Sequence, residues 1–204
     1  MARRAVAGGV RDQIAGLAAE VSAVDRALYR AIAQVPTPVL DQRMRQLSRA
    51  ANHSVLWLSI AAGLAAAGGS SGRRAAAQGV TAVGVTSAVV NIGIKSLYNR
   101  PRPDRGQVGV PAARQVSMPA SRSFPSGHSA SGFAFAAAVG TELPWLAPPL
   151  RVLAAAVAYS RVHTGVHYPG DALAGSVAGA SLGRAVTALV RRQSRRRSGH
   201  PPWR

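Results

Sequence analysis

The sequence predicts an all-α membrane protein: a bundle of about five transmembrane helices preceded by amphipathic helices at the membrane interface. Two observations carry this prediction. Of the 204 residues, 48% are apolar, and the 25 basic and 7 acidic residues are gathered into clusters separated by long uncharged stretches. Three of these stretches have 23, 20 and 19 residues. A bilayer core of about 30 Å is crossed by roughly 20 apolar residues in helical conformation, so all three are long enough to span it.

Residues 1–53 are expected to form two amphipathic helices rather than spans. Between residues 10 and 35, apolar side chains recur at steps of three or four, which places them on one helical face. These side chains are Val10, Ile14, Leu17, Val21, Val24, Leu28, Ile32 and Val35. Thr37-Pro38 then has the form of a cap and first residue of a second helix. We expect both helices to lie on the membrane interface or to cover the bundle.

The transmembrane domain is expected over residues 54–190. The uncharged stretches are 50–72, 75–94 and 123–141, and two further candidates are 149–166 and 170–190. Arg151 and Arg184 lie near the ends of the last two, where a long side chain reaches the headgroups. Gly175, Gly179 and Gly183, spaced by four, predict a smooth helix face for close packing. The alternative is a soluble bundle with the same helices buried.

Charge and composition narrow the class of protein. A net charge of +18 and a pI near 12 suit either nucleic acid or an anionic membrane surface. The apolar content favours the membrane, and we expect no nucleic-acid partner. The absence of cysteine excludes disulfides and thiolate metal sites. Residues 191–204 are expected to be a disordered polybasic tail attracted to anionic lipid. The alanine and arginine bias is typical of a high-GC bacterial genome.

Three polar blocks follow one another between Lys95, the only lysine of the chain, and Asp171. In one-letter code they are K-x6-R-P, P-S-G-H and S-R-x5-H-x3-D. Together they supply three cations, two histidines and a carboxylate at set intervals. These side chains are Lys95, Arg102, Arg161, His128, His167 and Asp171.

These residue types suit a phosphate ester, whose negative charges require several fixed donors. A helix that begins near Pro125 directs its first free amides, including those near Ser126 and Gly127, at the anion. A carboxylate at Asp171 is placed to accept an imidazole N–H from His167, four residues earlier, which leaves the other ring nitrogen free as a nucleophile.

Other polar residues near the blocks are expected to have ordinary roles. His53, His163 and His200 lie outside the blocks and are expected to be structural, although His163 shares a loop with Arg161. A loop exposed to water or lipid headgroups is the expectation for the remaining polar residues near the first block. These are Tyr98, Arg100, Arg105 and Arg122.

The ordered blocks resemble the type 2 phosphatidic acid phosphatase family, the membrane branch of a superfamily shared with bacterial acid phosphatases and vanadium haloperoxidases. The resemblance implies that His167 attacks phosphorus to form a phosphohistidine, that Asp171 orients its ring, and that His128 protonates the departing oxygen and later activates water. It also implies that the remaining residues of the blocks bind the phosphate, without a metal or other cofactor. These residues are Lys95, Arg102, Ser126, Gly127 and Arg161.

The predicted function is therefore that of a metal-independent integral membrane phosphatase that removes a terminal phosphate from a lipid phosphate or diphosphate. The family implies polyprenyl diphosphate, phosphatidylglycerol phosphate or phosphatidic acid as substrate. A polyprenyl-linked sugar phosphate is one alternative. Two others are a vanadate-dependent haloperoxidase and a non-catalytic basic protein that binds lipid or nucleic acid. If the spans alternate, the three blocks meet on one face, which the resemblance places outside the cytoplasm in a multi-pass protein of the inner membrane.

Overall fold

The structure, a computed structural model, describes residues 2–197 and is built from helices, without a strand among those residues. The nine α-helices of this part are α1 (Ala2–Gln34), α2 (Pro38–Ala50), α3 (Val55–Ala67), α4 (Gly69–Ala88), α5 (Lys95–Leu97), α6 (Arg105–Val108), α7 (Gly127–Glu142), α8 (Ala147–His163) and α9 (Pro169–Arg197). Short turns of 3-10 or π geometry join several of them. The predicted all-α membrane bundle is confirmed.

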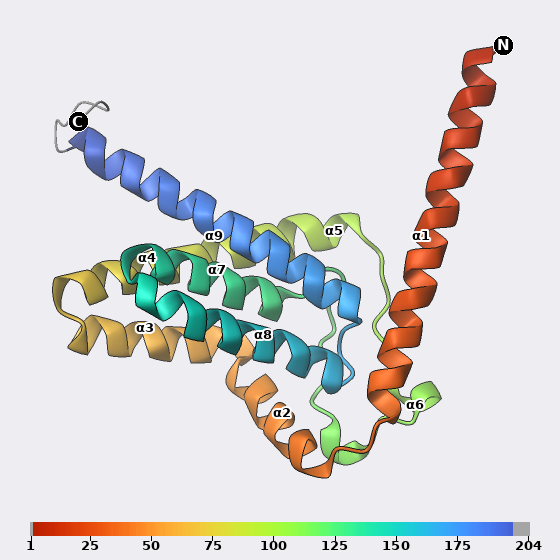
Figure 1. Cartoon of the computed structure of the whole chain (residues 1–204), viewed down its shortest axis with the longest axis horizontal. Coiled ribbons are helices and arrows are strands. Elements are labelled where there is room, and N and C mark those ends of the chain that lie inside the picture. Colours follow the sequence, from red (N-terminus) through yellow and green to blue (C-terminus); the bar gives the residue numbers. More distant parts are fainter. Residues whose placement is uncertain (1, 198–204) are drawn as a thin grey trace.

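Helix α7 is the centre of the bundle. It packs against α4, α8 and α9, and α3 lies beside α4 in an antiparallel hairpin (Figure 1). Trp57 of α3 and Phe135 of α7 meet in the core with their ring centroids 5.5 Å apart. Because α7 is nearly surrounded, a residue at its first turn is held by helices on several sides. The N-terminus of α7 is thus a rigid place for a functional side chain.

Glycines on α9 set its distance from α7. A Cβ on Gly175 would lie 2.3 Å from the backbone oxygen of Ser126, the N-cap of α7, and a Cβ on Gly179 or Gly183 would lie 2.1 or 2.6 Å from a backbone oxygen within α7, closer than side-chain atoms pack. The two backbones are therefore in direct contact along this seam, as small residues allow in membrane helices. The smooth face predicted from the spacing of these glycines is confirmed as the α7–α9 interface.

Two helices of the described part have the length and composition to cross a membrane. One is Gly69–Leu97, in which α4 continues through a π turn into α5, and the other is Pro169–Ser194 of α9. A third span is possible if α2 and residues 52–67, bent by 61°, count as one. Helices α7 and α8, both expected to span, have only 16 and 17 residues. Each of the five expected segments contains a helix, and two or three of them qualify as spans by length and composition.

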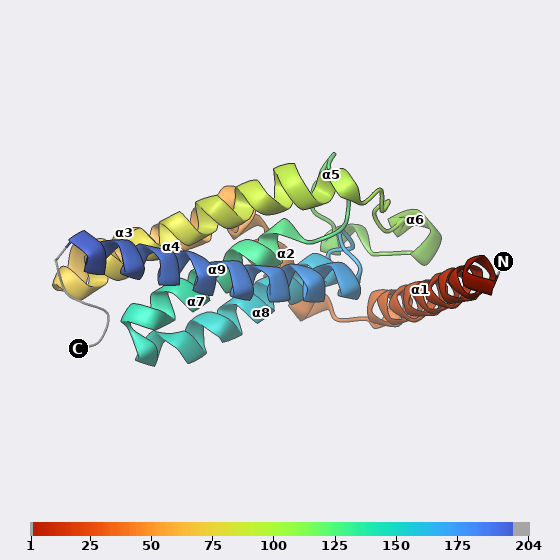
Figure 2. The same ribbon diagram turned by 90° about the horizontal axis from the view of Figure 1, so that it is seen from above.

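Helix α1 stands across the end of the bundle instead of lying along it (Figure 1), and it also extends beyond the other helices when the molecule is turned (Figure 2). Its apolar side chains Leu17, Val21, Val24 and Leu28 are 49–69% exposed. This part of the face therefore does not cover the bundle and is free for the membrane interface, whereas Ile32 near the end of the helix packs against the core. Val10 and Ile14 were expected on the same face, but their side chains are not among those that the structure describes.

The predicted disordered tail begins inside a helix. Helix α9 continues to Arg197, although disorder was expected from residue 191. Arg191 donates hydrogen bonds to the Thr141 carbonyl at 2.9 Å and to Glu142 at 2.8 Å. Arginine also favours helical conformation, so these two factors extend the helix. Residues 198–204, including His200, lie outside the described residues.

Candidate active site

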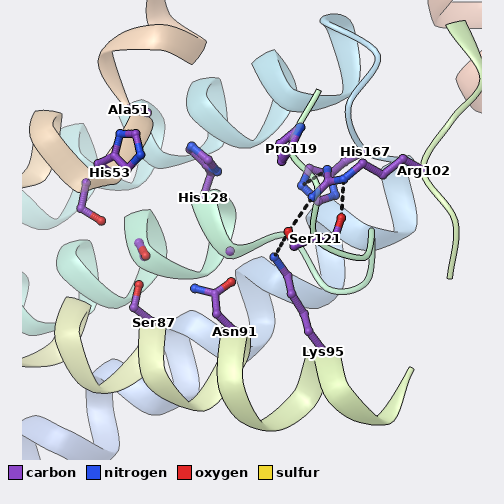
Figure 3. Close-up of a pocket in the computed structure, with 13 residues that line it drawn as sticks. Ala51, His53, Ser87, Asn91, Lys95, Arg102, Pro119, Ser121, His128 and His167 are labelled. Carbon is purple, nitrogen blue, oxygen red and sulfur yellow. Dashed lines mark hydrogen bonds between the residues drawn. The ribbon is translucent and has the colours of Figure 1, made fainter. Parts of the chain in front are cut away.

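A polar cavity of about 190 Å³ lies at the end of the bundle where the π turn, the start of α7 and the loop before α9 meet (Figure 3). Each of the three sequence blocks contributes to its wall. Its polar side chains include Lys95, Arg102, Ser121, Asn91, His53, His128 and His167. The structure thus brings together two cations and both histidines of the blocks around one space.

Lys95 reaches the cavity because of the π turn Val89–Ile94 at the end of α4. One extra residue per turn changes which side chains face inward, and such turns often occur at functional sites. Asn91 from this turn and Lys95 just after it both line the cavity. Lys95 is only 8% exposed, and its Nζ donates to Ser121 Oγ at 3.4 Å. Its ammonium group is therefore held within the wall.

Arg102 is fixed by four hydrogen bonds to backbone and side chain. Its guanidinium donates to the carbonyls of Ser121 and Val166, both at 2.7 Å, to Ser121 Oγ at 3.1 Å and to the Arg122 carbonyl at 3.3 Å. One guanidinium nitrogen also lies 3.2 Å from His167 Nε2. Because the planar fork is held on several sides, its orientation is set before any anion arrives.

The second block forms the N-terminus of α7. Ser126 caps the helix, its Oγ accepting the Ser129 N–H at 3.4 Å, while its own N–H donates to the Asp171 carbonyl at 2.9 Å. The helix itself begins at Gly127, which lines the cavity, whereas the side chain of Ser126 is buried behind it. The positive end of the helix dipole therefore faces the cavity, as in many anion sites.

His128 stands in the first turn of α7, and its Nε2 lies 3.0 Å from Asn52 Oδ1. Asn52 belongs to a single 3-10 turn, Asn52–Ser54, between α2 and α3. His53 from the same turn also lines the cavity, and Figure 3 shows His128 drawn between His53 and His167. Sequence analysis missed Asn52 and expected His53 to be structural. No local pattern ties this turn to a block about 75 residues later.

His167 lies in the loop between α8 and α9 and is 1% exposed. Its Nδ1 is 3.4 Å from Asp171 Oδ2, which is longer than a good hydrogen bond, and its Nε2 faces Arg102. Burial, with repulsion from Arg102, lowers the pKa of His167 to about 4. The ring is therefore neutral at pH 7. If Nδ1 carries the proton toward the carboxylate, then Nε2 presents a lone pair.

The carboxylate of Asp171, in the first turn of α9, is held by several donors. It accepts hydrogen bonds from the Ser123 hydroxyl, from the Tyr168 N–H at 2.9 Å and from Arg100 at 2.8 Å. Arg100 lies in a loop, as predicted, but it is directed inward and not at water or headgroups, because its guanidinium bridges two carboxylates and lies 4.3 Å above the Tyr168 ring. Ser123 and Arg100 are site residues that sequence analysis missed.

The second carboxylate is Asp25 of α1. Its carboxylate is buried and accepts a hydrogen bond from the Arg100 guanidinium at 2.6 Å and another from the Gly170 N–H at 2.7 Å. A continuous chain of contacts therefore runs from α1 through Arg100 and Asp171 to His167. In the sequence, Asp25 is one charge among several on an amphipathic helix, 145 residues before Gly170. Nothing in the spacing of charged residues along this helix marks Asp25 as part of a site.

Arg161 was expected to bind substrate, but it does not line the cavity. It is 1% exposed and donates to the hydroxyl and the carbonyl of Ser48 in α2, while its Nε has no hydrogen-bond partner among the described residues. His163 from the same turn donates toward Asp41 at 2.8 Å, in agreement with a structural role. Among residues 2–197, no three histidine or acidic side chains form a candidate metal site.

Comparisons with known proteins identify the family of this chain. Residues 75–195 match the model of the PAP2 superfamily. The decaprenylphosphoryl-5-phosphoribose phosphatase of Mycobacterium tuberculosis is 33% identical over 162 residues, which cover 77% of this chain and 84% of that protein. The protein of the same name from Mycolicibacterium smegmatis is 37% identical over 131 residues, or 64% and 68% of the two chains.

Two solved structures share the fold. LpxE of Aquifex aeolicus superimposes with a TM-score of 0.64 at 24% identity, covering 79% of this chain and 93% of its own. The PAP2-type phosphatidylglycerolphosphate phosphatase of Bacillus subtilis gives a TM-score of 0.61 at 24% identity, with 91% and 90% covered. At this level of identity the likeness concerns the arrangement of the helices.

Proposed function

Since this chain belongs to the PAP2 superfamily and is a membrane phosphatase, we propose that it removes the terminal phosphate of a polyprenyl-linked sugar phosphate through a phosphohistidine intermediate. One observation carries the proposal: His167 and His128 face the same cavity of about 190 Å³ as Lys95 and Arg102, with Asp171 behind the ring of His167.

Phosphate binding follows from the cations and the helix terminus. Lys95 supplies a point charge, Arg102 supplies a planar fork, and the N-terminus of α7 adds free amides at Gly127. Arg161 contributes its charge from behind the wall. These groups are in place before the substrate binds, so they stabilise the charge that develops on the phosphoryl oxygens with little rearrangement.

In the first step, His167 Nε2 attacks phosphorus in line with the departing oxygen. The N–P bond forms as the P–O bond to the sugar breaks, and Asp171 stabilises the positive charge on the ring. The departing oxygen takes a proton from His128. Asn52 accepts the Nε2–H of His128, which leaves Nδ1 as the nitrogen that transfers this proton.

His128 must therefore be protonated when the substrate is bound. Burial, together with the charges of Arg161, Lys95 and Arg102, opposes a positive charge on its ring before phosphate binds. A phosphate monoester brings up to two negative charges and reverses this balance. In the second step, water attacks phosphorus, His128 takes its proton, the N–P bond breaks, and inorganic phosphate leaves with His167 neutral again.

We also propose that the reaction requires no metal, because Lys95, Arg102 and the α7 terminus supply the positive charge around the phosphate. The proposed location is the inner membrane, with the site on the extracytoplasmic face. The family resemblance supports this orientation, and the arginine count does not, because basic residues lie at both ends of the bundle. Arg73, Arg74 and Arg191 lie at the end away from the site, whereas Arg100, Arg102 and Arg122 lie beside it. Since the chain has no cysteine, single cysteines introduced near Arg122 and Arg73 would report the topology by labelling from either side.

The direct test is phosphate release by the detergent-solubilised protein from a polyprenyl-phosphoryl ribose 5-phosphate, a prenyl diphosphate, phosphatidylglycerol phosphate and phosphatidic acid. We expect the first to have the highest kcat/KM. His167→Ala should lower kcat by about 10⁴-fold or more, because the nucleophile is lost. With ³²P-labelled substrate, rapid quenching should trap an alkali-stable, acid-labile phosphoprotein in the wild type and none in His167→Ala.

Three outcomes would contradict the proposal. Full activity of His167→Ala would exclude the histidine mechanism. Loss of activity in EDTA with recovery in magnesium or zinc would exclude the metal-free one. A prenyl diphosphate or phosphatidic acid that is hydrolysed with a higher kcat/KM would exclude the proposed substrate. Glu20→Gln, on the exposed part of α1, is the matched control for handling and folding.

A further inference from the structure

On the side of Arg102, the catalytic cavity adjoins another space. It shares Arg102, Pro119 and Ser121 with a second space of about 450 Å³, which we name the middle cavity. The rest of that wall consists of residues 99–101 together with Ala120 and Arg122. A molecule that projects from the catalytic cavity on this side therefore first enters a space whose wall contains three arginines, Asn99 and Ser121.

The middle cavity leads in turn to an apolar groove of about 800 Å³ between α1 and the start of α9, here named the α1 groove. The two share Asn99, Arg100 and Pro101. Apolar side chains from four segments line the groove. They are Val21, Val24 and Leu28 from α1, Tyr98 and Phe124 from the loops, and Leu173 from α9. Because α9 is a candidate span, the groove continues onto surface that faces lipid.

The arginines around the middle cavity differ in what already holds them. Arg100 is neutralised by Asp25 and Asp171, and Arg102 is held by the wall of the catalytic cavity. Arg122 is exposed, and within residues 2–197 its guanidinium has no hydrogen bond or ion pair. It is thus the cation in this cavity that is available to a second anion.

The three spaces follow one another in the order phosphate site, polar space with a free cation, apolar groove. We infer that this order selects a substrate in which a polar unit and a linking phosphodiester separate the terminal phosphate from the lipid chain. Arg122 binds the phosphodiester, the sugar occupies the middle cavity, and the first isoprene units enter the α1 groove. The inference rests on the proposed function and assigns its substrate specificity to Arg122 and to α1.

The same order disfavours two simpler lipids. In phosphatidic acid, the terminal phosphate is joined to the diacylglycerol without a second phosphate, so Arg122 has no anion to bind. In a prenyl diphosphate, the hydrocarbon begins directly after the second phosphate and must cross the polar space to reach the groove. Burying apolar chain against unpaired polar groups costs free energy, because those groups lose water without gaining a partner.

Arg122 is tested by comparing two phosphomonoesters, farnesyl-phosphoryl ribose 5-phosphate and free ribose 5-phosphate, with the detergent-solubilised full chain. In Arg122→Gln, the ratio of kcat/KM for the linked substrate to that for the free sugar phosphate should fall about tenfold, because a charge-assisted hydrogen bond to the phosphodiester is lost. Arg122→Lys should restore part of the ratio. Arg43→Gln, an exposed arginine of α2 outside all three spaces, is the control.

The groove is tested through chain length. In the wild type, kcat/KM should rise from methyl-phosphoryl to farnesyl-phosphoryl ribose 5-phosphate, since each buried methylene is favourable. Val21→Asp should remove most of this gain, while Ala19→Asp, on the same helix but outside the groove, should keep it. An equal gain in both variants would overturn the role of the groove.

Each remaining outcome is decisive. An unchanged ratio in Arg122→Gln, in a protein that still hydrolyses both sugar phosphates through His167, would overturn this inference alone. Failure of the wild type to hydrolyse either compound would overturn the proposed function. If phosphatidylglycerol phosphate has the highest kcat/KM and is equally sensitive to Arg122→Gln, the phosphodiester site stands, but the sugar and the polyprenyl chain are wrong.

Discussion

His167 and His128 face one cavity, but their surroundings differ. His167 is buried. Arg102 lies beside its Nε2, and the Asp171 carboxylate, which accepts hydrogen bonds from three donors, lies beside its Nδ1. His128 has one side-chain hydrogen-bond partner within the described part of the chain, the amide of Asn52. The comparison teaches that the nucleophile is oriented by a rigid network, whereas the residue that must gain and lose a proton is left responsive to the charge of the bound phosphate.

Replacing His128 should separate the two roles most clearly. His128→Asn is expected to lower kcat for an alkyl phosphate by about 10²- to 10⁴-fold, the range for loss of a general acid. With p-nitrophenyl phosphate the loss in the first step should be much smaller, because its leaving group departs without a proton, and phosphorylated His167 should accumulate. Rapid-quench measurement of the phosphoprotein checks this. Equal losses with both substrates would show that His128 does not act as the acid.

Asp25 tests whether the network behind His167 extends to α1. Asp25→Asn leaves Arg100 with Asp171 as its only carboxylate, which draws Asp171 away from the histidine. We expect kcat to fall about tenfold, comparable to a lost charge-assisted hydrogen bond, with KM changed less than about twofold. Asp25→Glu should recover part of kcat, and Glu20→Gln on the same helix should match the wild type. A change in KM alone would mean that Asp25 only docks α1 and is not a positioning residue.

The pH dependence tests the burial of His167. Attack on phosphorus requires the neutral ring of His167. Because burial lowers the pKa of His167 from the usual value near 6.5 to about 4, the ring stays neutral until the pH falls to about 4. The acid side of the kcat/KM profile should therefore fall as the pH drops through about 4. By the same linkage, the folded state loses stability over the interval from about 6.5 down to 4. An acid limb centred near 6.5 would show that the ring is solvated.

The smallest effect is expected at the contact between α9 and the N-terminus of α7, which fixes the positions of both histidines. A Cβ on Gly175 would lie 2.3 Å from the Ser126 carbonyl, at the point where α9 meets the N-terminus of α7. Gly175→Ala should destabilise the fold by about 1–3 kcal/mol, as overpacking does, and lower kcat with it. Gly84→Ala in α4, where a Cβ meets nothing within 4 Å, should be neutral or slightly stabilising in thermal unfolding. Similar effects of both would refute the close contact.

Much of the candidate site could be predicted because its chemistry lies in short local patterns. His167 and Asp171 are four residues apart across the start of a helix, and Gly127 begins another helix. Each of these relations depends on backbone geometry over a few residues. The positions of the blocks at the ends of the expected spans also placed them on one face of the bundle, which is where the cavity lies.

The rest could not be predicted because it depends on which surfaces meet. Asn52 reaches His128 across 76 residues, and Asp25 reaches Arg100 across 75. An aspartate on an amphipathic helix has the same local signature whether it faces water or a guanidinium. Arg161 has the spacing of a substrate ligand, yet the packing of α8 on α2 directs it to Ser48 and away from the cavity.

The sequence by itself determined the class of the protein and the set of reactive groups, because hydrophobic periodicity and helix-terminal spacing are properties of neighbouring residues. Only the tertiary structure decided which of those groups share a cavity, which arginines are already neutralised, and in what order phosphate-binding, polar and apolar spaces follow one another. These depend on the distances between distant segments, since burial and the partners of a charge are set by packing.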